Sequence, residues 1–299
     1  FFSILDKSMT WDEACYIGAG KFILKTGNFE YNAFRAHPPL SYYINSIFLL
    51  PLKFKEKIYS NDNCWEIGYD MAYHSGYNPK FILTLTRLPF IIMSMILSLY
   101  VFYWAKQLYG AKSGLLALFL YTFSTSIISQ SNLALTDMTT TFFIFIAIYY
   151  YWKFVTFNQK RYLYLTSIFF GLSLLSKLTG LVLIPVLTIL ILYNALQKRL
   201  NKKCLLLAAK QLFTIFIIGF LIMFIGFGLQ FKPLKSVMNE HYVERAYQEF
   251  DKKIKNEPLR KFALYTFEKV PIPFPAYFFG LGGVGYHSIE GVGSFLNGE

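Results

Sequence analysis

The sequence predicts an all-α polytopic membrane protein, and three observations support that fold class. Of the 299 residues, 55% are hydrophobic and only 15% are charged, where soluble domains carry roughly a quarter charged residues. Several apolar runs are long enough to cross the hydrocarbon core as helices, in which every backbone polar group is paired. Basic and acidic residues also occupy different segments of the chain. A soluble fold of this size has no interior large enough for so much apolar surface.

The apolar runs predict six spans, whose lengths match or approach the thickness of a bilayer. They lie near 84–104, 114–132, 138–152, 162–177, 179–196 and 211–230. The fourth and fifth are short. Because they follow one another closely, consecutive connections are expected on alternating sides of the membrane.

The distribution of charge predicts the orientation. The connections at 105–113, 153–161 and 197–210 hold two, three and five Lys or Arg residues and no acidic residue. The positive-inside rule makes these three connections cytoplasmic. All seventeen acidic residues lie in 1–83, at Asp137 or after 232, which are then extracytoplasmic. The formal net charge of +12 is therefore attributed to membrane topology and not to nucleic acid.

Two outer segments are predicted. In the first, Thr10 is a plausible N-cap for an amphipathic helix over WDEACYIGAGKFILK, and PPLSYYINSIFLL reads as a second helix in the membrane interface. In the last, HYVERAYQEFDKKIKNEP reads as a surface helix, followed by Pro-rich PIPFP and Gly-rich GLGGVG stretches. We therefore divide the chain into a transmembrane core, 1–230, with a truncated first helix, and an extracytoplasmic loop, 231–299, truncated at its end.

Three carboxylates are candidate catalytic groups. Asp12 and Glu13 fall in the first turn of the predicted outer helix, and Asp12 is the favoured general base because adjacent helical positions diverge by about 100°. The alternative is that the pair only complements the helix dipole. Asp137 interrupts the boundary between two apolar spans, where an ionisable residue is costly, or it caps the following helix.

Basic side chains and histidines complete the candidate set. Arg87 and Lys177 lie at predicted outer ends of spans, where they suit a lipid phosphate or extend toward head groups. His37 precedes two prolines that restrict its backbone. His287 and Glu290 are spaced three residues apart in the last loop and are a weak signal for a metal or substrate site. The cysteines Cys15, Cys64 and Cys204 form no CxxC motif, and a Cys15–Cys64 bridge is left open.

Taken in order, these residues resemble a family pattern. The series is Asp12-Glu13, then HPPL from His37, Arg87 opening a span, Asp137 in ALTDM, and Lys177 in GLSLLSKLTGL. It is similar to the dolichyl-phosphate-mannose protein mannosyltransferases and their prokaryotic relatives among the GT-C membrane glycosyltransferases. The lysine that commonly follows HPPL in the eukaryotic enzymes is absent here, where Ser41 and Tyr42 stand.

The resemblance implies a GT-C helical domain that moves a sugar from a polyprenyl-phosphate donor to a protein or lipid/glycan acceptor, with inversion, at the extracytoplasmic face of a prokaryotic cell membrane. Asp12 would act as base, supported by Glu13. Asp137 would organise the pocket, and Arg87 and Lys177 would neutralise phosphate. His37, His287 and Glu290 would contact substrate. No cofactor is certain. Some relatives use a divalent metal, and no ligand spacing here decides whether this chain does.

Two other classes of function compete with this interpretation. A transporter or lipid flippase places ionisable residues within its spans and often shows inverted repeats, whereas these spans are almost free of charge. A scaffold protein of the membrane predicts no dependence on any outer carboxylate.

Overall fold

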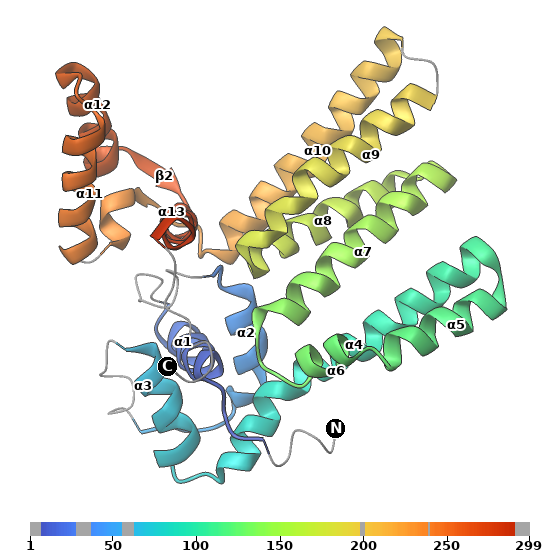
Figure 1. Cartoon of the computed structure of the whole chain (residues 1–299), viewed down its shortest axis with the longest axis horizontal. Coiled ribbons are helices and arrows are strands. Elements are labelled where there is room, and N and C mark those ends of the chain that lie inside the picture. The colour runs from blue at the N-terminus through green and yellow to red at the C-terminus, as the bar shows by residue number, and fades with distance from the viewer. Residues whose placement is uncertain (1–6, 28–36, 56–62, 198–200, 239, 291–299) are drawn as a thin grey trace.

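The computed structural model describes residues 7–27, 37–55, 63–197, 201–238 and 240–290, with side chains described as far as residue 283. Within these ranges the chain is almost entirely helical, with one short pair of strands. Long helices extend from a region where the shorter ones gather (Figure 1). The all-α polytopic fold class is confirmed.

Helix α1 (Trp11–Thr26) begins at a capping box, as the sequence predicts. The Thr10 hydroxyl accepts a hydrogen bond from the Glu13 N–H, and the Glu13 carboxylate accepts one from the Thr10 N–H at 2.9 Å. The helix ends at Gly27, whose φ of 66° suits glycine. Unlike the one-sided helix we expected, α1 is buried continuously from Glu13 to Lys21, because other outer helices pack against more than one of its faces.

Two short helices enclose α1. They are α2 (Leu40–Ser46) and α3 (Cys64–Tyr69). A Cβ added to Gly68 would lie 1.8 Å from the Ala14 carbonyl oxygen, so the backbones of α1 and α3 touch and only glycine fits. The Cys15–Cys64 disulfide joins the same two helices. The bridge that the sequence left open is therefore present.

Among the described residues, four helices are long and apolar enough to cross a membrane. They are α4 (Pro79–Tyr109), α7 (Thr136–Phe157), the 3₁₀ turn η6 (Leu178–Val182) continued by α9 (Leu183–Gln197), and α10 (Lys202–Gly226). The pair α5 (Ala111–Thr122) and α6 (Thr125–Ser131), bent by 61°, makes a fifth if counted as one span. Helix α8 (Lys160–Ser176) has 17 residues, about 25 Å, which is short of the hydrocarbon thickness.

The outer surfaces of these helices are apolar. Leu206 on α10 is 71% exposed and Phe213 is 68% exposed, and similar side chains cover α5. Contiguous exposed apolar surface marks contact with a membrane or a partner. On helices of this length it indicates lipid contact.

The turns of the helix bundle segregate by charge. The regions around the α4–α5 and α7–α8 turns and the start of α10 carry basic residues and lie at one end of the long helices, whereas α1–α3 and α11–α13 lie at the other end (Figure 1). This is the separation that the sequence predicts for the two sides of the membrane.

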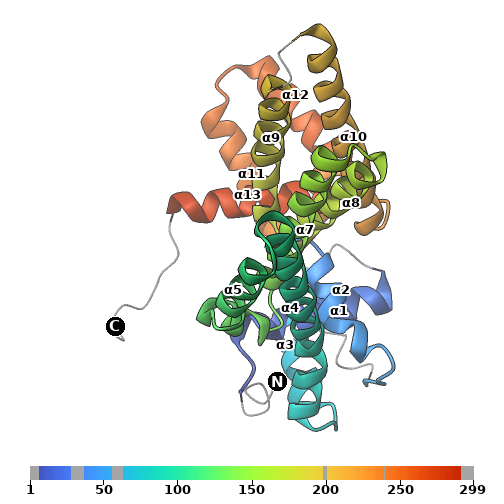
Figure 2. The same ribbon diagram turned by 90° about the vertical axis from the view of Figure 1, so that its right-hand side faces the viewer.

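The last part of the chain forms an excursion from the end of α10. Strand β1 (Phe231–Pro233) leads through the 3₁₀ turn η7 (Leu234–Val237) to α11 (Glu240–Lys253) and α12 (Glu257–Lys269), and the chain returns through β2 (Pro271–Pro273) to α13 (Pro275–Glu290). The strands pair antiparallel, and the Phe274 N–H donates to the Gln230 carbonyl at 3.0 Å. Helix α13 lies between the α11–α12 hairpin and the group α1–α3 in both views (Figures 1 and 2).

Two sequence-based expectations for this excursion differ from the structure. The PIPFP stretch forms β2 and not an irregular loop, because each strand has a single neighbour and tolerates proline on its open side. The GLGGVG stretch lies within α13, which begins with Pro275 at a position favourable for proline. The proposed boundary between 1–230 and 231–299 stays a prediction.

Candidate active site

A buried ion pair connects α1 to α4. The Arg87 guanidinium donates from Nε to Glu13 Oε1 and from Nη2 to Glu13 Oε2, both at 2.8 Å, and both side chains are fully buried. Arg87 also donates to the backbone carbonyls of Lys7 and Ser8 at 3.0 and 2.8 Å. The two-point geometry is that of a strong arginine–carboxylate contact.

The Glu13 carboxylate also holds the turn that precedes α7. Its Oε1 accepts from the Ala134 N–H at 2.9 Å, in addition to the cap at Thr10. Burial by itself would raise the pKa of Glu13, but the hydrogen bonds and positive charge of Arg87 outweigh it and lower that pKa below its ordinary value. The ionised carboxylate of Glu13 therefore joins three parts of the fold: the start of α1, helix α4 and the turn before α7.

Asp12, the neighbour of Glu13, is exposed. Four residues farther along α1, on the same face, lies the buried Tyr16. Burial and the nearby negative charges of Asp12 and Asp137 raise the pKa of Tyr16 above its ordinary value. The two carboxylates of α1 and α7, which are far apart in the sequence, thus act on the same phenol.

Asp137 pairs with Lys177 at the end of the bundle where α1–α3 lie. The Lys177 ammonium lies 2.7 Å from Asp137 Oδ1, and the two side chains are 21% and 46% exposed. Asp137 begins α7, whereas Lys177 stands between α8 and η6. The pair borders a groove of about 460 Å³ between α7 and η6, which is lined by Asp137, Thr140, Thr141, Ile144, Thr179, Leu181 and Val182. Three threonines, one carboxylate and three aliphatic side chains therefore line one cavity.

His37 belongs to the same group. Its ring lies 5.9 Å from that of Tyr16, which in turn lies 5.1 Å from Tyr42. Burial and the charge of Lys177 lower the pKa of His37 to about 4, against a smaller opposing effect of Asp137. The imidazole is therefore neutral near pH 7. Its buried Nδ1 has no hydrogen-bond partner within the described part of the chain.

The structure thus brings together four of the residues selected from the sequence. Asp137 and Lys177 form an ion pair, and the charges of Asp12 and Asp137 act on Tyr16, whose ring lies 5.9 Å from that of His37. Glu13 and Arg87 form the buried pair beside them, so neither offers a free charged group to this space. His287 and Glu290 lie on α13, and their side chains are outside the described residues. The roles of all eight in substrate binding or catalysis stay predictions.

Sequence reasoning missed Tyr16 and Tyr42. The spacing of Tyr16 from Asp12, one helical turn, was the signal that could have found it. Tyr42 lies two residues after HPPL but gives no such signal, since its contact with Tyr16 depends on the packing of α2 against α1. As for metals, the described side chains include no group of three His, Cys, Asp or Glu residues placed to hold an ion.

The fold and the site define an integral membrane protein with a polar, partly open site at one end of its transmembrane helices. The model of the dolichyl-phosphate-mannose-protein mannosyltransferase family matches residues 82–233, just over half of the chain, and the chain belongs to that family. It is therefore a membrane glycosyltransferase of the GT-C type. The match includes Arg87, Asp137 and Lys177. No curated protein and no solved structure matches the chain.

Proposed function

We propose that this protein transfers mannose or another hexose from a polyprenyl-phosphate donor to a hydroxyl of a protein or lipid/glycan acceptor, at the extracytoplasmic face of a prokaryotic membrane. The observation that carries the proposal is the partly exposed Asp137–Lys177 pair, 2.7 Å apart beside a groove, at the end of the bundle where α1 presents the exposed Asp12. In this proposal, the Asp12 carboxylate accepts the proton of the acceptor hydroxyl, and the Lys177 ammonium binds the phosphate that leaves.

In the proposed reaction, the acceptor hydroxyl gives its proton to Asp12 while its oxygen attacks the anomeric carbon. The bond from that carbon to the phosphate oxygen breaks, and its electrons leave with the polyprenyl phosphate. Lys177 stabilises the negative charge that develops there. One displacement at the anomeric carbon inverts its configuration.

The remaining residues have supporting parts in this proposal. Asp137 holds the Lys177 ammonium in place through their 2.7 Å contact. Glu13 and Arg87 fix the start of α1 and thereby the position of Asp12. His37, neutral near pH 7, packs 5.9 Å from the Tyr16 ring and would help position the side chains that contact the sugar.

The grooves of the bundle agree with an amphiphilic donor. The threonine-lined groove beside Asp137 shares Leu181 with an apolar groove of about 360 Å³ between η6, α8 and α10. Phe170, Phe213, Phe216 and Phe220 are among the side chains that line the second groove. A sugar phosphate at the Asp137 end of the first groove would lie beside the Lys177 ammonium, and its isoprenoid chain would contact the apolar surface of the second.

Two observations support the proposed orientation. The basic turns lie at the end of the bundle opposite the site (Figure 1), as the positive-inside rule requires of an extracytoplasmic site. The Cys15–Cys64 disulfide lies on the side of the site, and disulfides persist in oxidising, non-cytosolic compartments.

Transfer of radiolabelled sugar from a polyprenyl-phosphate donor in native membranes tests the proposal. Asp12→Asn is expected to lower the rate between about a hundredfold and ten-thousandfold, because the base is lost, with unchanged membrane insertion. The control is Asp70→Asn, which removes an exposed carboxylate of the same outer region. Wild-type rates in Asp12→Asn would exclude Asp12 as the base, and no transfer by the wild-type protein to protein or lipid would exclude the function.

A further inference from the structure

Helix α11 has an apolar face that the described part of the chain covers only in part. Tyr242, Ala246 and Phe250 repeat at every fourth position, and the exposed Glu244 and Asp251 lie on the opposite face. Such a helix normally packs its apolar face into a core, yet no residue of α11 is buried. The face is only half covered by its neighbours.

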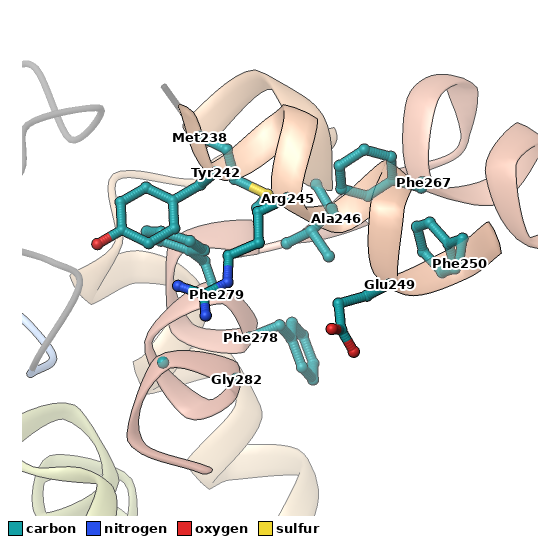
Figure 3. A pocket seen from close by; sticks show the side chains of 12 residues that line it. Met238, Tyr242, Arg245, Ala246, Glu249, Phe250, Phe267, Phe278, Phe279 and Gly282 are labelled. Carbon is teal, nitrogen blue, oxygen red and sulfur yellow. The ribbon is translucent and has the colours of Figure 1, made fainter. Parts of the chain in front are cut away.

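A hollow of about 370 Å³ lies along this face, between α11 and α13. Its size is within the range of ligand sites, roughly 300–1,000 Å³. Its lining is mostly apolar and includes five aromatic rings, from Tyr242, Phe250, Phe267, Phe278 and Phe279. Met238 and Ala246 add further apolar surface on the α11 side (Figure 3).

Two opposite charges enter this apolar hollow. Arg245 and Glu249, one helical turn apart on α11, both extend from the helix toward Phe278 and Phe279 (Figure 3). Glu249 also pairs with Lys253 at 2.7 Å, at the exposed edge. The hollow itself thus presents a strong donor and a strong acceptor without a net charge. An anionic lipid head group would meet repulsion from Glu249 as well as attraction from Arg245.

We propose that this hollow binds a short, extended, uncharged polypeptide segment with apolar side chains, as the docking part of a protein acceptor. The proposal rests on the proposed transferase function. A peptide supplies carbonyls for Arg245, N–H groups for Glu249 and apolar side chains for the rings. A carbohydrate offers much less apolar surface for the same five rings.

Helix α13 connects this hollow to the candidate active site. Ala276, Tyr277 and Gly280 of α13 face His37, and Phe278, Phe279 and Gly282 line the hollow. The two spaces are therefore separated by one helix, about 10–12 Å across. An extended peptide covers about 3.3–3.6 Å per residue. The acceptor hydroxyl is then three or four residues from the docked segment.

The test is peptide binding to the full chain in nanodiscs, measured by fluorescence anisotropy without donor. The probe is a fluorescein-labelled peptide with blocked ends, alternating Phe and Leu, and one Thr four residues beyond them. The same peptide with Ser in place of Phe and Leu is its control. Ala246→Trp fills the hollow and is expected to raise the Kd about tenfold or more. Gln248→Trp, on the exposed face of α11, is the matched control and is expected to keep the wild-type Kd.

A second variant covers the case in which the new Trp disturbs α11. Glu249→Gln keeps the size of the side chain and removes the charged acceptor, and it is expected to raise the Kd about threefold to tenfold. Both variants are also expected to raise the KM for the peptide in transfer while leaving the donor KM unchanged. Asp12→Asn should bind the probe with the wild-type Kd and transfer nothing.

Three outcomes would overturn this assignment: equal affinity for the two peptides, an unchanged Kd in both variants, or displacement of the probe by phosphatidylglycerol vesicles or a mannose oligosaccharide. Binding is measured without donor, so specific binding without any transfer contradicts the transferase function alone. Transfer with an unchanged Kd in the variants contradicts the peptide site alone.

Discussion

The ammonium of Lys177 lies 2.7 Å from a carboxylate oxygen of Asp137, although the two residues are 40 positions apart and stand on different helices. Both remain partly exposed, and Asp137 lines a cavity. An ion pair in this setting contributes little to stability, about 0–1 kcal/mol. Its position at the opening of a threonine-lined groove makes it a better candidate for ligand binding than for holding the fold.

Lys177→Met is therefore expected to damage activity and leave the fold intact. Loss of the ammonium should lower kcat/KM for the polyprenyl-phosphate donor about a hundredfold, with an unchanged Tm. Initial rates at varied donor concentration measure this effect. Lys112→Met, at the opposite end of the bundle, is the matched control. A donor kcat/KM within twofold of wild type in Lys177→Met would remove the residue from the phosphate site.

Breaking the Glu13–Arg87 pair is expected to destabilise the protein. Arg87→Met leaves a buried carboxylate without its partner, which costs about 3–5 kcal/mol. The double variant Glu13→Gln, Arg87→Met should recover part of this loss because no charge remains buried. Thermal unfolding of the detergent-solubilised protein gives the comparison. A wild-type Tm in Arg87→Met would contradict the structural role of the pair.

The same pair predicts a loss of stability in acid. The folded-state pKa of Glu13 lies below its ordinary value, so the ionised carboxylate stabilises the fold above the unfolded pKa of about 4.3. This stabilisation declines once the pH is below the pKa of Glu13 in the unfolded chain. It is lost as the pH falls through the lower pKa of Glu13 in the folded protein. Glu13→Gln should lack this component when Tm is followed from pH 6 to pH 3.

His37 predicts a second, separate pH dependence. Its folded-state pKa is about 4, below the value of about 6.5 expected in the unfolded chain. Between these values the unfolded chain binds the proton more strongly, so stability falls as the pH is lowered from about 6.5 to 4. In His37→Gln the fall over this window should be smaller, and Tm as a function of pH measures the difference. Identical curves would show that His37 is solvated or protonated in the folded protein.

The Cys15–Cys64 disulfide predicts both stability and sidedness. For a sequence separation of 49 residues, loop-closure entropy gives about 4 kcal/mol of stabilisation, so Cys15→Ala should lower the Tm. In spheroplasts, a membrane-impermeant maleimide should label Tyr69→Cys, introduced at an exposed position of α3, from outside. Cys204, at the opposite end of the bundle, is the internal control and should react only after the membrane is opened. The reverse labelling pattern would place the candidate active site in the cytosol.

Local features of this protein were predictable, and contacts between distant segments were not. The Thr10 cap and the carboxylates in the first turn of α1 follow from a spacing of three residues and are confirmed. Apolar length placed the long helices. The pairing of Glu13 with Arg87 spans 74 positions, and nothing in local spacing indicates which of the two first-turn carboxylates turns inward.

In the segment after α10, too, the sequence predicted a local element but not the contacts between distant residues. A surface helix was predicted from its alternation of charged and apolar residues, and α11 confirms it. The strand pair was not predicted, since three-residue strands rich in proline have almost no sequence signal. The hollow beside Arg245 depends on the approach of α13, which sequence reasoning had assigned to a loop.

The hydrogen bond from Phe274 to Gln230 and the β1–β2 pair close the excursion at its root, where it leaves and rejoins the bundle. The segment between these strands, including the α11–α12 hairpin, is therefore an insertion whose two ends meet. Such a segment can be lengthened, shortened or replaced without moving the transmembrane helices. Under the proposed docking role of α11 and α13, the choice of acceptor is therefore separable from the chemistry that handles the donor.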